Sequence, residues 1–107
     1  MTVTHRTLAY GRWFTLSLAT QMGNIGSEVN RALLWKEKDR FLSQKAGERA
    51  LELLDLTIQD KRWQRGLKEL TRAREILVDA LLGGKEYGSL LEDIDHYFFH
   101  FALAARA

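Results

Sequence analysis

Apolar residues recur at steps of three and four positions along four stretches of the chain, which is the spacing of one helical face. The first stretch, about residues 11–37, carries such a seam at Leu18, Met22, Ile25, Val29 and Ala32. Gly23 and Gly26 lie within it, and each lowers helix propensity by about 1 kcal/mol relative to alanine. Two interpretations follow. Either the helix is continuous and its glycines let another backbone approach closely, or a break at Met22–Ser27 gives two shorter helices.

Two further helices are predicted in the middle of the chain. The second begins near Asp39, a good N-cap, and runs to about residue 60. The third covers about residues 61–82, with Trp63 on its buried face. Gly83 and Gly84 follow it directly, and glycine readily takes the left-handed conformation that ends a helix. The pattern therefore indicates two helices of about 20 residues joined by a very short turn.

The fourth helix is predicted to open at Ser89, which together with Glu92 has the spacing of a capping box. Residues 1–10 show no helical period and are expected to form a short extended N-terminal arm. Four amphipathic helices with short connections predict an all-α fold, an antiparallel up-down four-helix bundle. The whole chain, residues 1–107, is expected to be a single domain.

Composition supports this fold class and excludes several kinds of function. The 107 residues include no proline, which is compatible with long uninterrupted helices. They include no cysteine, which excludes disulfides, thiolate zinc sites, iron–sulfur clusters and a cysteine nucleophile. The charges are spread evenly, and no apolar run approaches about 18 residues, so no membrane partner is predicted. We expect a soluble, cytoplasmic protein.

Two clusters of large apolar residues predict that the chain self-associates. The fourth helix carries consecutive aromatic rings from Tyr97 to Phe101, more than one core can cover. The first helix, about 40 Å long at 1.5 Å per residue, is expected to overhang its partners near its apolar end. We therefore predict a homo-oligomer. The candidate interface residues are Leu33, Leu34, Trp35, Tyr97, Phe99 and Phe101.

Basic residues form a stripe along the predicted third helix. Lys61, Arg65, Lys68 and Arg72 step by four, three and four positions, and Arg62 and Arg74 flank them. One interpretation pairs this stripe with the acidic residues Glu48, Glu52 and Asp55 of the second helix, in the same chain or in a neighbouring copy, or leaves it solvated. The other is a track for nucleic-acid phosphates, because Lys and Arg at helical spacing can neutralise successive phosphates.

The sequence shows no catalytic constellation, so the favoured interpretation assigns no catalytic residue, no metal and no cofactor. His96 and His100 are four residues apart and share a helix face, a spacing that can supply two zinc ligands. An alternative function is therefore a small metal-dependent enzyme that uses the His96/His100 pair or the acidic helix faces. The favoured function is a non-catalytic, self-assembling accessory or adaptor protein.

One segment resembles a known group of helical-bundle proteins. It comprises Asn24-Ile25-Gly26-Ser27-Glu28 and Arg31, followed by Phe41-Leu42-Ser43, Gly47 and Ala50. It is similar to the ribosomal-RNA intervening-sequence proteins and to the accessory variability determinant proteins of diversity-generating retroelements. This chain has Gly-Ser-Glu where that group has Ala-Glu-Gly, and a longer stretch before Phe41. Residues 61–107 show no motif of the group.

The resemblance implies a non-enzymatic four-helix bundle that assembles as a ring, often a pentamer. It also implies a basic surface that engages nucleic acid or a reverse transcriptase. The basic stripe is compatible with such a surface.

Overall fold

A computed structural model describes residues 11–84, 88 and 90–106 of the chain. Four long helices follow one another: α2 (Leu18–Trp35), α3 (Arg40–Gln59), α4 (Leu67–Leu81) and α5 (Leu91–Arg106), with a 3₁₀ segment, η1 (Lys61–Gly66), before α4. No strand occurs in these residues, so the all-α prediction is confirmed for the described part. The expected arm and the Ser89 cap lie outside the described residues.

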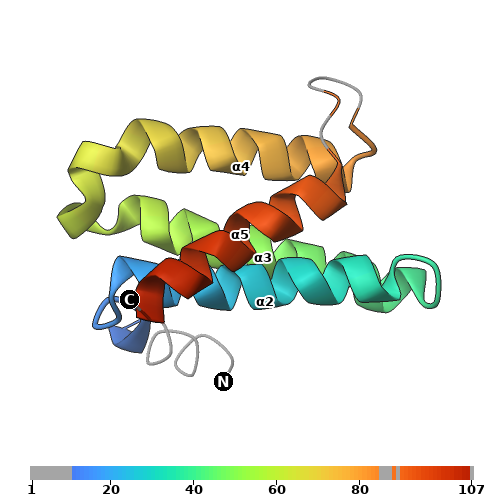
Figure 1. Ribbon diagram of the computed structural model, residues 1–107, viewed down its shortest axis with the longest axis horizontal. Coiled ribbons are helices and arrows are strands. Elements are labelled where there is room, and N and C mark those ends of the chain that lie inside the picture. Colours follow the sequence, from blue (N-terminus) through green and yellow to red (C-terminus); the bar gives the residue numbers. More distant parts are fainter. Residues whose placement is uncertain (1–10, 85–87, 89, 107) are drawn as a thin grey trace.

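The long helices run in alternating directions, but they are not all near-parallel (Figure 1). Helices α2, α3 and α4 lie roughly side by side, whereas α5 crosses in front of them obliquely from the end of α4 to the start of α2. Helix α2 packs most extensively against α3 and α5, and α4 touches α5 much less. The oblique path of α5 therefore leaves open surface on both of its flanks.

Helix α2 begins seven residues later than the sequence pattern indicates. Ser17 caps it, because the side chain of Ser17 accepts a hydrogen bond of 3.1 Å from the backbone N–H of Thr20. Residues 11–13 are helical and the chain then turns, so a continuous helix over residues 11–37 is wrong. With 18 residues α2 is about 27 Å long, shorter than the 20-residue α3. The predicted length of about 40 Å is therefore wrong.

The helix continues through both glycines, and the alternative of a break at Met22–Ser27 is wrong. A Cβ atom on Gly26 would lie 2.7 Å from Phe98 Cβ, and one on Gly23 would lie 3.5 Å from Ala102 Cβ. The predicted close approach of another backbone is confirmed, and the approaching backbone is that of α5. The missing side chains at these positions set the distance between α2 and α5.

The core confirms the apolar seam of the first helix. Met22, Ile25, Val29 and Ala32 have no exposed surface. They are covered on one side by residues of α3 and on the other by α5, whose Phe98 is also fully buried. The seam of α2 is therefore the centre of the molecule.

The predicted third helix is divided in two. Residues 61–66 form η1, and Trp63 has the non-helical angles φ −105° and ψ 24°, so a single helix over residues 61–82 is wrong. The division lies between Asp60, whose side chain caps η1 by accepting a 3.1 Å hydrogen bond from Arg62 N–H, and Gly66, which precedes α4 with φ −98° and ψ 12°. At the other end Gly83 and Gly84 have positive φ of 104° and 75°, which confirms the predicted glycine stop.

Candidate functional site

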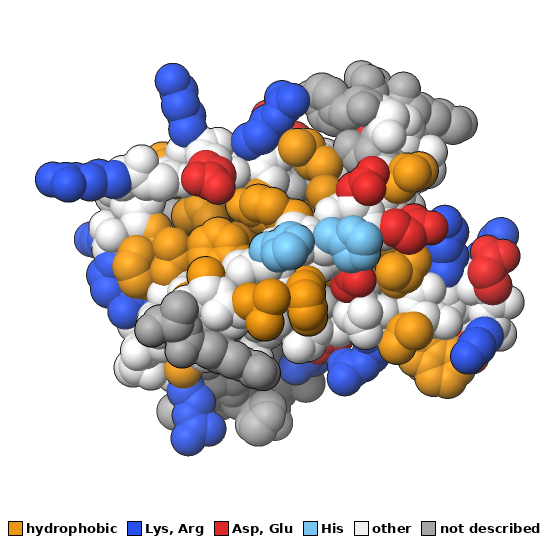
Figure 2. All heavy atoms as spheres, viewed as in Figure 1, with side chains coloured by type: hydrophobic (Ala, Val, Ile, Leu, Met, Phe, Trp, Pro, Cys, Tyr) orange, Lys and Arg blue, Asp and Glu red, His pale blue; other side chains and the backbone are white. Residues whose placement is uncertain are grey.

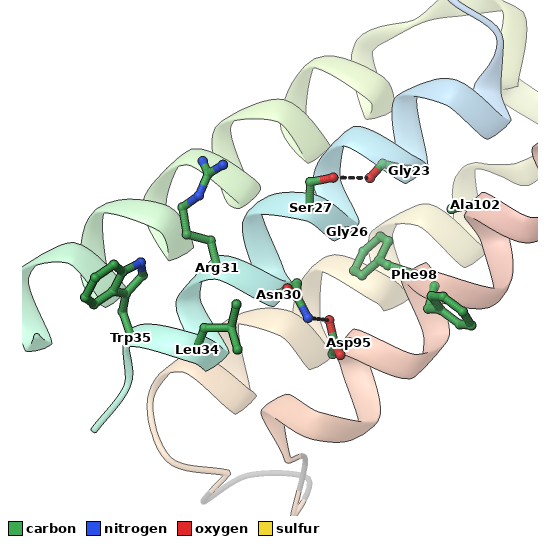
Figure 3. A pocket seen from close by; sticks show the side chains of 11 residues that line it. Gly23, Gly26, Ser27, Asn30, Arg31, Leu34, Trp35, Asp95, Phe98 and Ala102 are labelled. Carbon is green, nitrogen blue, oxygen red and sulfur yellow. Dashed lines mark hydrogen bonds between the residues drawn. The ribbon is translucent and has the colours of Figure 1, made fainter. Parts of the chain in front are cut away.

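A groove of about 580 Å³ runs between α2 and α5. At its floor Gly23 and Gly26 of α2 meet Phe98 and Ala102 of α5 (Figure 3). Asn30 donates a 3.2 Å hydrogen bond from Nδ2 to Oδ1 of Asp95, which links the two helices across the groove. The groove therefore lies on the surface beside the close contact of α2 with α5.

Three predicted interface residues come together at this groove. Leu34 is 60% exposed, Phe99 is 56% exposed and Trp35 is 37% exposed, and all three line it. Figure 3 shows Leu34 projecting toward α5 and Trp35 projecting away from it at the outer end. Residues from two apolar clusters that are distant in the sequence thus line one groove. We call these three residues, Leu34, Trp35 and Phe99, the α2–α5 surface.

The other three predicted interface residues lie elsewhere. Leu33, Tyr97 and Phe101 are half-buried and pack against the core. Tyr97 and Phe101 face the opposite flank of α5, toward α4. The aromatic run of α5 is therefore divided among the core and two different surfaces.

A second groove separates α5 from α4, and it consists of two adjoining hollows of about 230 and 170 Å³. Figure 2 shows hydrophobic side chains gathered between these helices, with Lys and Arg side chains projecting at the α4 edge. Tyr97 and Glu69 line both hollows, and the Tyr97 hydroxyl donates a 3.2 Å hydrogen bond to Oε1 of Glu69. Burial, followed by the charge of Glu69 and this hydrogen bond, raises the pKa of Tyr97 to about 12.

Three of the predicted basic residues, Arg62, Arg65 and Arg72, line this second groove, but the predicted set does not form one helical stripe. Lys61, Arg62 and Arg65 lie on η1, whereas Lys68 and Arg72 lie on α4. The guanidinium of Arg62 bonds Asp60 at 2.7 Å and lies 4.4 Å from the centre of the Trp63 ring. The non-helical backbone at Trp63 thus interrupts the stripe.

The remaining members of the basic set differ in their partners. Arg72 lies 4.0 Å from Glu75 of its own helix. Lys61, Arg65 and Lys68 are exposed, and none forms an ion pair with another residue in the described part of the chain.

Within the described residues, Glu48 and Asp55 of α3 do not pair with the four residues of the stripe. Asp55 pairs with Arg74 of α4, which flanks the stripe, and Glu48 pairs with Lys45 of its own helix.

A buried polar network that the sequence pattern does not reveal closes one end of the molecule. Gln21 is fully buried, and its Nε2 donates to the Trp13 carbonyl at 2.9 Å and to Asp60 Oδ2 at 3.2 Å. Its Oε1 accepts from the Trp63 indole at 3.0 Å, and the Trp13 indole donates to Thr57 at 3.1 Å. The network joins the chain before α2 to the end of α3 and to η1.

Asp60 is the charged member of this network. The side-chain hydrogen bonds from Arg62 lower its pKa to about 2, and the hydrogen bonds from the Arg62 N–H and from Gln21 act in the same direction. Burial acts in the opposite direction and is outweighed. Every buried side-chain nitrogen and oxygen among the described residues has a hydrogen-bond partner, so this network stabilises the fold rather than presenting an open site.

The histidine pair lies on the outer face of α5, where His96 and His100 are both exposed. Among the described residues, no three His, Cys, Asp or Glu side chains are placed to hold a metal ion. None of the helices described here has the length and apolar character needed to cross a membrane. Comparison of the chain with protein-family models, with curated proteins and with solved structures gave no match.

Proposed function

We propose that this chain is a non-catalytic assembly protein whose copies associate through the α2–α5 surface. One observation carries the proposal: Leu34 and Trp35 of α2 and Phe99 of α5 are exposed and line a single groove. Several large apolar side chains exposed around one groove are typical of a protein–protein contact. Scattered single apolar residues would not have this meaning.

The expected strength of the contact follows from the exposure of these residues. Fully burying a Leu or Phe side chain contributes about 1.5–3 kcal/mol. Because each of the three side chains is between 37% and 60% exposed, each adds about 1 kcal/mol when another copy covers it. A symmetric pair places Phe99 of each copy against the groove of the other, whereas a ring such as the expected pentamer requires two different contacting surfaces.

Light scattering in dilute solution tests the proposal, because a homo-oligomer has a mass that is a multiple of 12.4 kDa. A Phe99→Glu change should weaken association by at least about tenfold, since a carboxylate cannot be buried there without a partner. Phe41→Glu is the matched control, because Phe41 is 65% exposed on α3 and does not line the groove. A wild-type monomer, or equal effects of the two changes, would overturn the proposal.

A nucleic-acid partner stays a prediction that three residues of the basic set still support. Lys61, Arg65 and Lys68 are exposed and have no ion pair within the described residues. Three phosphate contacts give a slope of log affinity against log salt of roughly −2 to −3. A filter-binding titration at two salt concentrations measures that slope, and an absence of binding at low salt would contradict the prediction.

A further inference from the structure

The α4–α5 groove has the form of a docking site for a helix. Its two hollows have volumes of about 230 and 170 Å³. Each volume is larger than the roughly 150 Å³ of a protein cavity that can bind benzene. One Leu or Phe side chain therefore fits in each. The first hollow is lined by Gly66 at the end of η1 and by Leu70 of α4, and the second by Ala73 and Ile76 of α4, a displacement of about one to two helical turns. Apolar side chains at i and i+4 or i+7 of a docked helix have the same spacing.

The charges around the groove define what kind of helix fits. Arg65 lines the larger hollow and Arg72 the smaller one, and Lys68 is exposed on the α4 segment between them. A partner helix that places apolar residues in the hollows presents its flanking residues to this basic edge. Acidic flanking residues are therefore favoured by charge complementarity.

One contact in the groove disfavours base stacking. The Arg62 guanidinium already lies over the Trp63 ring, so this face of the indole is occupied by a cation. Most residues that line the two hollows are apolar, which suits the apolar face of a helix better than a phosphate backbone. We propose that the α4–α5 groove binds the apolar face of an acidic amphipathic helix from a partner protein. This site is separate from the α2–α5 surface and does not depend on self-association.

The test uses the full chain and a synthetic peptide of about 16 residues, long enough to form a helix. The probe peptide carries Leu at i, i+4 and i+7 and Glu at the flanking positions. One control peptide has the same composition in scrambled order, and a second replaces every Glu with Lys. Binding is measured by fluorescence anisotropy at about 0.15 M salt. We expect the patterned acidic peptide to bind more tightly than either control.

Protein variants test the basic edge of the groove. Arg65→Glu should weaken peptide binding about three- to tenfold, because it replaces an attraction with a repulsion at an exposed position. Arg40→Glu makes the same charge change at the start of α3, away from the groove, and should change binding less than about twofold. Circular dichroism establishes that both variants keep their helix content.

Backbone amide NMR spectra locate the bound peptide. Shifts concentrated at Leu70, Ala73, Ile94 and Tyr97 support the proposal, since these residues line the hollows. Equal binding of patterned and scrambled peptides, or shifts confined to the α2–α5 surface, would overturn it. The proposal would also be overturned if the amide signals of the groove residues shift when the protein is diluted without peptide, because a second copy of the chain then occupies the groove. Shifts with a single-stranded oligonucleotide but not with the peptide would make it a nucleic-acid site and equally refute the proposal.

Discussion

A Gly26→Ala substitution should destabilise the protein even though alanine is the better helix former. Alanine in a helix interior is favoured over glycine by about 0.5–1 kcal/mol. The added methyl group, however, would lie 2.7 Å from Phe98 Cβ, with backbone carbons of Phe98 at 3.5 and 3.6 Å behind it. A Cβ atom cannot rotate away, so α5 must move outward from α2. Overpacking of this kind costs about 1–3 kcal/mol.

The structure puts this site in the upper part of that range, because the obstruction is backbone and the base of a side chain. With the gain in helix propensity subtracted, we expect a net loss of about 1–2 kcal/mol. Gly23→Ala is the matched control in the same helix and groove. Its methyl group would meet Ala102 Cβ at 3.5 Å, an ordinary van der Waals contact. It should therefore stabilise the protein by about 0.5–1 kcal/mol.

Urea denaturation followed by circular dichroism gives the free energy of unfolding of both variants, measured at one protein concentration because association adds to stability. The two variants should differ by about 1.5–3 kcal/mol, which corresponds to roughly 6–24 °C in Tm for a domain of this size. If Gly26→Ala proves as stable as Gly23→Ala, the two helices do not meet at Gly26, and the account of the α2–α5 packing is wrong.

Three further outcomes are expected. The pKa of Asp60 is lowered from 3.8 to about 2, so the ionised carboxylate stabilises the folded protein by about 1–2 kcal/mol once the screening of the half-exposed Arg62 is taken into account. This stabilisation is complete above about pH 5 and disappears as the pH falls toward 2. Urea titrations across this range should show that loss, and Asp60→Asn should flatten it. Tyr97 should ionise only near pH 12 in an absorbance titration, and stability should fall as the pH rises from 10 toward 12, with Tyr97→Phe removing this step. Trp13→Phe should cost about 1–3 kcal/mol by leaving Thr57 buried without its donor, and a second change of Thr57→Val should recover part of that loss in a double-mutant cycle.

Features of the fold that depend only on neighbouring residues, such as helix periodicity and helix caps, could be predicted from the sequence. The seam of α2 follows from its own periodicity, and Asp39 caps α3 as expected, with Oδ1 accepting from the Leu42 N–H at 3.1 Å. The start of α2 was not predicted because the apolar run from Trp13 continues past Ser17 without a change of period. A single capping serine decides the boundary, and the pattern does not single it out.

The candidate surfaces depend on the angle between helices, which periodicity does not contain. The sequence predicts that Leu34 and Phe99 are exposed, because their helices carry more apolar residues than one core can cover. That both residues line one groove depends on the contact between α2 and α5 at Gly26. The network around Gln21 likewise assembles residues from separate segments. A glutamine directly beside the apolar seam of α2 was the one available signal of it.

The attachment of α5 to α2 has a consequence for how the chain is made. Asn30 and Asp95, which bond across the two helices, are 65 positions apart, and α5 is the last of the described helices to leave the ribosome. Until it does, one side of the fully apolar α2 seam has no cover, although α3 can already protect the other side. The nascent chain therefore passes through a stage with exposed apolar surface, in which chaperone binding and premature aggregation compete with the arrival of Phe98.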